Sequence, residues 1–306
     1  MSDFDHKALI SNLSAQERQA LLAQDDFHGL RQFGLHAGAI AFVGALIAIS
    51  QNQISIILVF LLMLSQGILI CFLFTTLHET VHRTPFKTDA LNVWVGRICG
   101  FLVFLGPDWF RYFHFAHHRF THDPENDPEL ASPKPETLWQ YLKYLSGLPE
   151  TKDRIVTLLR NAIWINEDTY VPARSRSKVM REARIQLALY GGIVVVSLLL
   201  RSPIVFYVWL LPIVLGAPFL RGYLLAEHAR CPNVASMLEN TRTTLTNRTI
   251  RFLAWNMPYH VEHHAYPAVP FHKLPAFHEH IRAHIVHLEN GYVAFNKSYV
   301  AEALKK

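Results

Sequence analysis

Charged side chains are scarce in this sequence, and one long segment has none. Asp, Glu, Lys and Arg make up 17% of the 306 residues, whereas hydrophobic residues make up 51%. No charged residue occurs between Arg31 and Glu79. A chain of this length could not bury several such apolar runs in one soluble core, so the composition argues against a soluble protein and predicts one embedded in lipid.

Cysteine is scarcer still. The three residues, Cys71, Cys99 and Cys231, form no Cys-x-x-Cys pair, which excludes the common zinc and iron–sulfur spacings. We expect reduced thiols. Residues 1–30 lack the apolar core of a signal peptide, so we expect the N-terminus to stay in the cytoplasm. The net charge is +5, but the sequence contains no recognisable nucleic-acid-binding motif, so we predict no nucleic-acid partner. We expect the basic residues to contact lipid head groups instead.

Four apolar runs are long enough to cross a bilayer, and polar turns divide them into two pairs. Gln51-Asn52-Gln53 separates the first pair, and Arg201-Ser202-Pro203 separates the second. We therefore predict an all-α integral membrane fold with four transmembrane helices in two hairpins, at residues 35–50, 54–77, 185–200 and 204–220. The shorter run 98–106 ends before Pro107 and is predicted to be interfacial or re-entrant.

Four spans put both termini on one side of the membrane. Of the 29 Lys and Arg residues, Arg201 alone falls in a loop expected on the side opposite the termini. The positive-inside rule therefore assigns the side with the termini to the cytoplasm. We predict a single domain, residues 1–306, with a cytoplasmic helical cap. Its expected parts are an N-terminal cytoplasmic segment (1–33), a first hairpin (35–77), a first part of the cap (83–184), a second hairpin (185–220) and a second part of the cap (221–306).

Histidine, by contrast, is abundant, with 18 residues. Eight of them form three spaced motifs, which are His78-x-x-x-His82, His114-x-x-His117-His118 and His260-x-x-His263-His264. Residues i, i+3 and i+4 share one face of a helix, so we expect each motif to aim its imidazoles at one point. The predicted topology places all three motifs on the cytoplasmic side.

Eight imidazoles exceed the needs of one four-coordinate zinc ion but suit two metals with five or six ligands each. Nitrogen ligands that leave room for oxygen favour iron, so we predict a di-iron site in the cap. Two alternatives stay open. His78-Glu79-Thr80-Val81-His82 also matches the motif of intramembrane zinc metalloproteases, although this leaves the other two motifs unexplained. A metal transporter would place His or Asp within the spans, where His36 stands alone.

The three motifs, in this order and flanked by paired spans, resemble the membrane fatty acid desaturase family, with its hydroxylase and carotenoid ketolase relatives. The resemblance covers roughly residues 74–274 and includes the segments around the second and third motifs, His117-His118-Arg119-Phe120-Thr121-His122-Asp123-Pro124, Asn126-Asp127-Pro128-Glu129 and His263-His264-Ala265-Tyr266-Pro267. It implies an oxidoreductase in which two iron ions and molecular oxygen remove hydrogen from an unactivated aliphatic chain. The ligands that it implies are His78, His82, His114, His117, His118, His260, His263 and His264.

The family typically adds a ligand between the second and third motifs, and the resemblance assigns that role to His228. Some desaturases carry an asparagine four residues earlier that reaches the metal through water, but this sequence has Leu224 there. Asn256, four residues before His260, is a candidate substitute. We expect five carboxylates near the motifs to orient ligand imidazoles, namely Glu79, Asp123, Asp127, Glu227 and Glu262. We expect His122 to lie beside the site, and the histidines from His272 to His287 to be solvated.

The sequence contains no His-Pro-Gly-Gly signature of a fused haem carrier, so electrons would come from a separate ferredoxin- or cytochrome-type protein with its reductase. The first function that we predict is introduction of a double bond into a fatty acyl chain of a lipid. Hydroxylation or ketolation of a lipid, carotenoid or hydrocarbon by the same centre is the alternative, because the outcome depends on how the substrate carbons are positioned.

Overall fold

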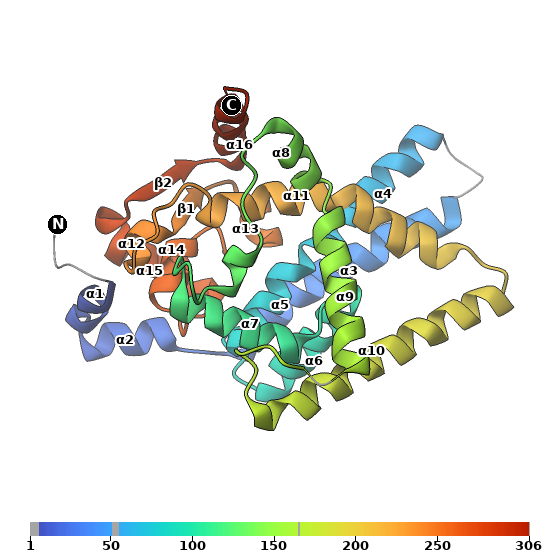
Figure 1. The fold of residues 1–306 in the computed structure, drawn as a ribbon, viewed down its shortest axis with the longest axis horizontal. Helices are drawn as coiled ribbons and strands as arrows, with labels where there is room; N and C mark the ends of the chain where they lie inside the picture. The colour runs from blue at the N-terminus through green and yellow to red at the C-terminus, as the bar shows by residue number, and fades with distance from the viewer. Residues whose placement is uncertain (1–5, 51–54, 165, 306) are drawn as a thin grey trace.

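The computed structural model describes residues 6–50, 55–164 and 166–305, and most of them fold into helices (Figure 1). Four helical segments are long and apolar enough to cross a membrane, which are Ala15–Ser50, Ile56–His82, Ala173–Leu199 and Phe206–His228. The predicted fold class is therefore confirmed in outline, as a helical chain with four candidate spans. The turn expected at residues 51–53 lies outside the described residues.

The first half of the chain supplies two candidate spans and the helix with the second histidine motif. Ser14 forms a capping box with Glu17 at the start of α2. The elements are α1 (His6–Asn12), α2 (Ala15–Leu22), α3 (Asp26–Ser50), α4 (Ile56–Cys71), α5 (Leu73–His82), α6 (Asp89–Leu102), α7 (Pro107–Phe120), the short 3-10 helix η1 (Pro128–Ala131), α8 (Leu138–Leu145) and α9 (Leu148–Ile163).

The second half supplies the other two candidate spans and a group of short C-terminal elements. These are α10 (Ala173–Leu199), the π-helix η2 (Phe206–Leu210), α11 (Leu211–His228), α12 (Met237–Asn240), β1 (Arg242–Leu245), α13 (Arg248–Leu253), α14 (His260–Ala265), η3 (Phe271–Lys273), α15 (Leu274–Ile281), η4 (Arg282–His284), β2 (His287–Asn290) and α16 (Tyr292–Ala303). Strands β1 and β2 pair in parallel, with Arg242 opposite His287. This short ladder is an addition to the all-α prediction.

The run at residues 98–106 contains a sharp bend. It covers the end of α6 and the loop before α7, and these two helices meet at 98°. Pro107 stands in the first turn of α7, where a missing N–H costs nothing. The bend fits the predicted interfacial or re-entrant segment and equally fits one broken span.

Helices α3 and α4 of the first predicted hairpin pack together, and the spans also make contacts outside the two predicted hairpins. Helix α11 packs most extensively against α4, and α10 packs against α9. Gly67 and Gly216 face each other at the α4–α11 crossing, where a Cβ on Gly67 would lie 1.9 Å from the Pro212 carbonyl oxygen. Small residues thus let the two helices approach closely, as is common between membrane helices.

Each candidate span runs further than its apolar sequence. Helix α10 begins at Ala173 instead of residue 185, and α11 continues from residue 220 to His228. Helix α5 likewise continues to His82, where Arg83 in the left-handed conformation (φ 64°) ends it. A helix satisfies its own backbone hydrogen bonds, so it persists into the polar region without an apolar surface.

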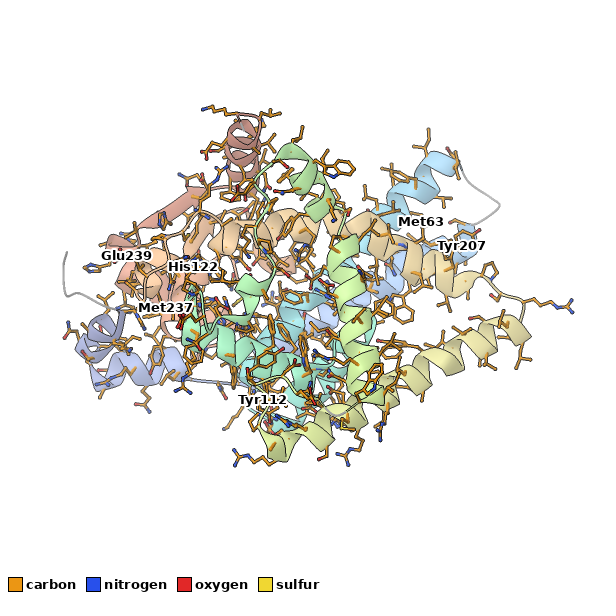
Figure 2. The ribbon with its side chains drawn as sticks, viewed as in Figure 1. Met63, Tyr112, His122, Tyr207, Met237 and Glu239 are labelled. Atoms are coloured by element: carbon orange, nitrogen blue, oxygen red, sulfur yellow. The ribbon has the colours of Figure 1, made fainter. Side chains whose placement is uncertain are left out.

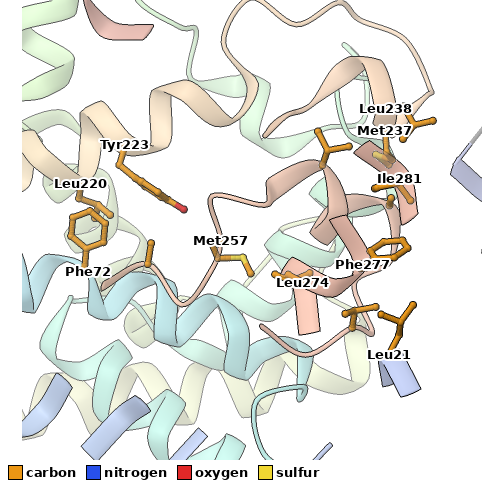
Figure 3. Packing of buried hydrophobic residues seen from close by; sticks show 14 of the residues in the cluster. Leu21, Phe72, Leu220, Tyr223, Met237, Leu238, Met257, Leu274, Phe277 and Ile281 are labelled. Atoms are coloured by element: carbon orange, nitrogen blue, oxygen red, sulfur yellow. The ribbon is translucent and has the colours of Figure 1, made fainter. Parts of the chain in front are cut away.

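A buried apolar cluster joins the spans to the C-terminal elements (Figure 3). Phe72 and Leu220 pack together at one end of it, and Phe277 and Ile281 of α15 lie at the other. The cluster fixes α14 relative to α5 and α11. A smaller cluster with Met63 and Tyr207 lies at the opposite end of the molecule from His122 (Figure 2).

Candidate metal centre

Four helices bring nine histidines to one place. Helix α5 carries the first motif, α7 the second and α14 the third, and α11 ends on His228. Thr243 of β1 positions α14, because its hydroxyl accepts the Val261 N–H at 3.2 Å and donates to the Glu262 carboxylate at 2.5 Å. The β-ladder therefore holds the third motif against the other two.

The first group consists of His78, His82, His114, His118 and His263. Each residue offers one ring nitrogen, and these five nitrogens all lie within 4.8 Å of one another. Three contacts between Nε2 atoms connect it. His114 Nε2 lies 2.8 Å from His82 Nε2 and 3.0 Å from His118 Nε2. His263 Nε2 lies 3.1 Å from His118 Nε2. These imidazoles therefore converge through the same ring nitrogen.

The second group consists of His117, His228, His260 and His264. His117, His228 and His264 share a candidate metal position. His228 Nε2 lies 3.2 Å from His117 Nε2 and 3.0 Å from His260 Nε2, which adds His260 to the group. All four side chains are buried. The structure thus brings His228 beside the motifs, although it belongs to none of them.

The two groups divide the motifs between them. The pairs spaced i and i+4 stay together, since His114 and His118 join the first group and His260 and His264 the second. The intermediate residues, His117 and His263, cross to the opposite group. The expectation that each motif aims at one point is therefore wrong for the second and third motifs. Neighbouring helical residues point about 100° apart, so a helix between two sites serves both.

The nitrogens of each group lie close enough to share one ion. Two nitrogens that each lie about 2.1 Å from one ion are about 3.0 Å apart at a right angle, and about 3.4 Å apart at a tetrahedral angle. The five shortest Nε2 pairs span 2.8–3.2 Å, and the candidate ligand atoms of each set lie within 4.8 Å of one another.

Unpartnered buried nitrogens also point to a metal. His78 Nε2 and His264 Nε2 are buried and have no hydrogen-bond partner among the described residues. Leaving a polar atom unsatisfied costs about 1–3 kcal/mol, and one metal ion in each group would satisfy these two nitrogens. Burial, followed by repulsion from neighbouring imidazoles, holds the pKa of His263 and of His264 well below the usual value. Both rings are therefore neutral, which is the form that binds metal.

Two of the predicted carboxylates lie against ligand imidazoles. The Asp127 carboxylate accepts from His117 Nδ1 at 3.0 Å. Glu79 Oε1 lies 3.8 Å from His78 Nδ1 and 3.7 Å from His263 Nδ1, which is too long for a hydrogen bond to either ring. Asp127 thus orients its ring directly, while Glu79 lies between two rings.

A third predicted carboxylate, Glu227, lies at a similar distance, 3.6 Å from His260 Nδ1. Two other predicted residues are engaged elsewhere. Asp123 is bonded to Asn126 within its own exposed loop. The amide of Asn256 donates to the Phe271 carbonyl and accepts from Arg251, so both of its ends are used outside the two groups.

Glu262 has partners that the sequence did not indicate. It accepts from Thr243 and is bonded to His278 Nδ1. His278 is buried, so the expectation of solvated C-terminal histidines is wrong for this residue. A helical register argument could have found it, because His278 follows Leu274 by four residues on the buried face of α15.

Glu129 is the acidic residue near the site that the sequence analysis missed as a candidate. Its Oε2 lies 3.2 Å from His117 Nε2. The signal was present in Asn126-Asp127-Pro128-Glu129, two residues beyond Asp127. His122 lies beside the second group as expected, with its ring 5.5 Å from that of His228 and bonded to Asn233 at 3.0 Å.

A cavity of about 1060 Å³ opens onto both groups. His78 and His114 of the first group and His117, His228 and His260 of the second line it. The lining also includes apolar and aromatic side chains, which are Phe74, Leu105, Trp109, Phe110, Phe113 and Leu224, and charged side chains such as Lys134, Glu150 and Arg154. The volume lies just above that of ordinary ligand pockets, about 300–1,000 Å³.

Comparison with known proteins agrees with this geometry. A search of curated proteins found no significant match. The family model described as fatty acid desaturase matches residues 55–296, which include all three histidine motifs and His228. With its candidate membrane-spanning helices and clustered histidines, the chain belongs to the fatty acid desaturase family.

Proposed function

We propose that this protein uses two iron ions and molecular oxygen to introduce a double bond into a fatty acyl chain of a lipid. Membership of the family implies an oxidoreductase of the desaturase or hydroxylase type that acts on fatty acyl chains. The observation that carries the finer proposal is the pair of buried imidazole groups, with Nε2 atoms 2.8–3.2 Å apart, at the end of a large cavity.

The protein's own residues would hold the metals and exclude water. The two groups supply five and four imidazoles, and Asp127 fixes the ring of His117. When bound, the iron pair would supply the oxygen chemistry that removes hydrogen from an unactivated carbon. Desaturation takes two hydrogens from adjacent carbons, and these reduce one oxygen molecule to two waters together with two electrons and two protons. We propose that a separate ferredoxin- or cytochrome-type donor and its reductase supply the electrons.

The surroundings of the cavity support a substrate that arrives from the membrane. Helix α9 lies across the direction of α10 and α4 (Figure 1), and Arg154 and Thr157 on one side of it line the cavity. Its residues Ile155 and Ile163 are exposed, as an amphipathic helix at a membrane surface requires. We propose that the centre and both termini face the cytoplasm, where the donor would dock.

The test is expression in a host that lacks such enzymes, followed by mass spectrometry of total lipids. Desaturation is expected to yield a lipid lighter by two hydrogens. A product heavier by one oxygen atom would instead establish hydroxylation, which the same centre could perform.

Metal analysis of the purified protein checks the centre itself. We expect about two irons per chain, following the two imidazole groups. An active preparation with one zinc and no iron would overturn the proposal in favour of a protease at His78-Glu79-Thr80-Val81-His82.

A further inference from the structure

The two imidazole groups differ by one protein donor. The first group has five imidazoles, whereas the second has four. Leu224, which stands one helical turn before His228 and lines the cavity, offers no donor atom. A fifth protein donor for the second group would have to come from another part of the chain.

Glu129 lies where this donor is needed. Its Oε2 is 3.2 Å from His117 Nε2, and that same nitrogen lies 3.2 Å from His228 Nε2. The carboxylate oxygen is thus as close to His117 Nε2 as the nearest imidazole nitrogen of the second group is. A carboxylate oxygen and imidazole nitrogens together form common iron sites.

Neighbouring residues hold Glu129 in this position from two sides. Its backbone N–H donates to Asp127 Oδ1 at 2.9 Å, and Asp127 also accepts from His117 Nδ1. Lys134 Nζ donates to Glu129 Oε1 at 2.7 Å, which leaves Oε2 directed toward His117. One aspartate thus fixes both the imidazole and the backbone of the loop that carries the carboxylate.

The surroundings of Glu129 suit a metal ligand as well. The side chain lines the cavity and is 33% exposed. The ammonium of Lys134 pairs with one carboxylate oxygen, and the other oxygen is turned toward His117.

We propose that Glu129 is a carboxylate ligand of the second metal ion, completing the group formed by His117, His228, His260 and His264. This assignment rests on the proposed di-iron function. It makes the two ions chemically different, because one is held by nitrogen alone and the other by nitrogen and a carboxylate oxygen. The competing explanation is that Glu129 serves only as the ion-pair partner of Lys134.

Three variants separate these explanations. Glu129→Gln keeps the shape of the side chain and removes its charge. Lys134→Met breaks the same ion pair but leaves the carboxylate. Glu125→Gln is the matched control, because Glu125 lines the same cavity on the same loop and is exposed. Titration of each iron-free protein with Fe²⁺ measures the affinity of both sites, and Mössbauer spectroscopy of the loaded protein reports the ligands of each iron.

We expect Glu129→Gln to weaken one of the two binding events by about 10–100-fold and to alter one of two Mössbauer components. Lys134→Met and Glu125→Gln should retain both components. If Glu129→Gln binds two irons with unchanged affinity and spectrum, Glu129 is not a ligand, although the di-iron centre stands. Equal losses in Glu129→Gln and Lys134→Met would favour the ion pair alone. A wild-type protein that binds no iron would instead overturn the proposed function.

Discussion

The two imidazole groups are held in different ways. In the first group, Nδ1 of His78, His118 and His263 has no hydrogen-bond partner among the described residues. In the second group, the corresponding nitrogens of His117, His228 and His264 meet Asp127, the Asn240 carbonyl and the Thr121 hydroxyl at 3.0, 3.4 and 3.3 Å.

The difference shows two ways to position a ligand ring. Helix geometry and close packing of five rings fix the first group, whereas hydrogen bonds from outside hold three of the four rings in the second group. The fourth ring, His260, has no partner for Nδ1 among the described residues. Outer hydrogen bonds orient a ligand imidazole and raise its basicity. We therefore expect substitution of a carboxylate next to the rings to affect the two groups unequally. Loss of one imidazole should lower turnover to a similar extent in either group.

Loss of one ring in either group should have the largest effect. We expect His82→Ala and His264→Ala each to lower turnover at least about 100-fold and to lose iron, because both ions are needed for one reaction. Turnover and iron per chain measure this. His280→Ala, an exposed histidine on α15, is the control. Near-normal turnover in either variant would contradict the expectation that the reaction needs both groups.

Loss of the Asp127 carboxylate, which accepts a hydrogen bond from His117, should have the next largest effect. Asp127→Asn replaces a carboxylate that holds both His117 and the Glu129 loop, so we expect turnover or iron affinity to fall by about 10–100-fold. Asp123→Asn, four residues earlier and bonded to Asn126 instead of to a histidine, should leave both quantities unchanged. An equal effect of the two variants would show that the loop fold matters rather than the bond to His117.

The corresponding change in the first group should be milder. Glu79 lies 3.8 and 3.7 Å from its two imidazole nitrogens, so Glu79→Gln removes no direct hydrogen bond to a ring. We expect a loss of iron affinity of about tenfold or less. Titration of the iron-free protein measures it beside Asp127→Asn. A larger loss in Glu79→Gln would reverse the comparison between the groups.

Loss of the contact between His278 and Glu262 should have the smallest effect on turnover. His278→Ala leaves the buried Glu262 with Thr243 alone, so we expect a loss of about 1–3 kcal/mol of stability and a lower midpoint of thermal unfolding. His280→Ala on the same helix is again the control. Turnover per iron-loaded molecule should stay close to wild type, and a selective loss of turnover would place Glu262 in the metal centre.

The sequence by itself determined the local parts of this protein. Uninterrupted apolar runs require helices in lipid, since a buried backbone must satisfy its own hydrogen bonds, and this predicted the four candidate spans. The i, i+3 and i+4 spacing predicted the histidine motifs on helices, and the capping box at Ser14 was equally local.

Only the tertiary structure decided how these parts meet. The side that a histidine faces depends on what packs against each side of its helix, so the assignment of His117 and His263 to opposite groups could not be read from spacing. The contact of Glu129 with His117 likewise depends on how the loop after α7 folds back. The approach of α4 to α11 at Gly67 is a contact between segments far apart in sequence, and such packing leaves no local pattern.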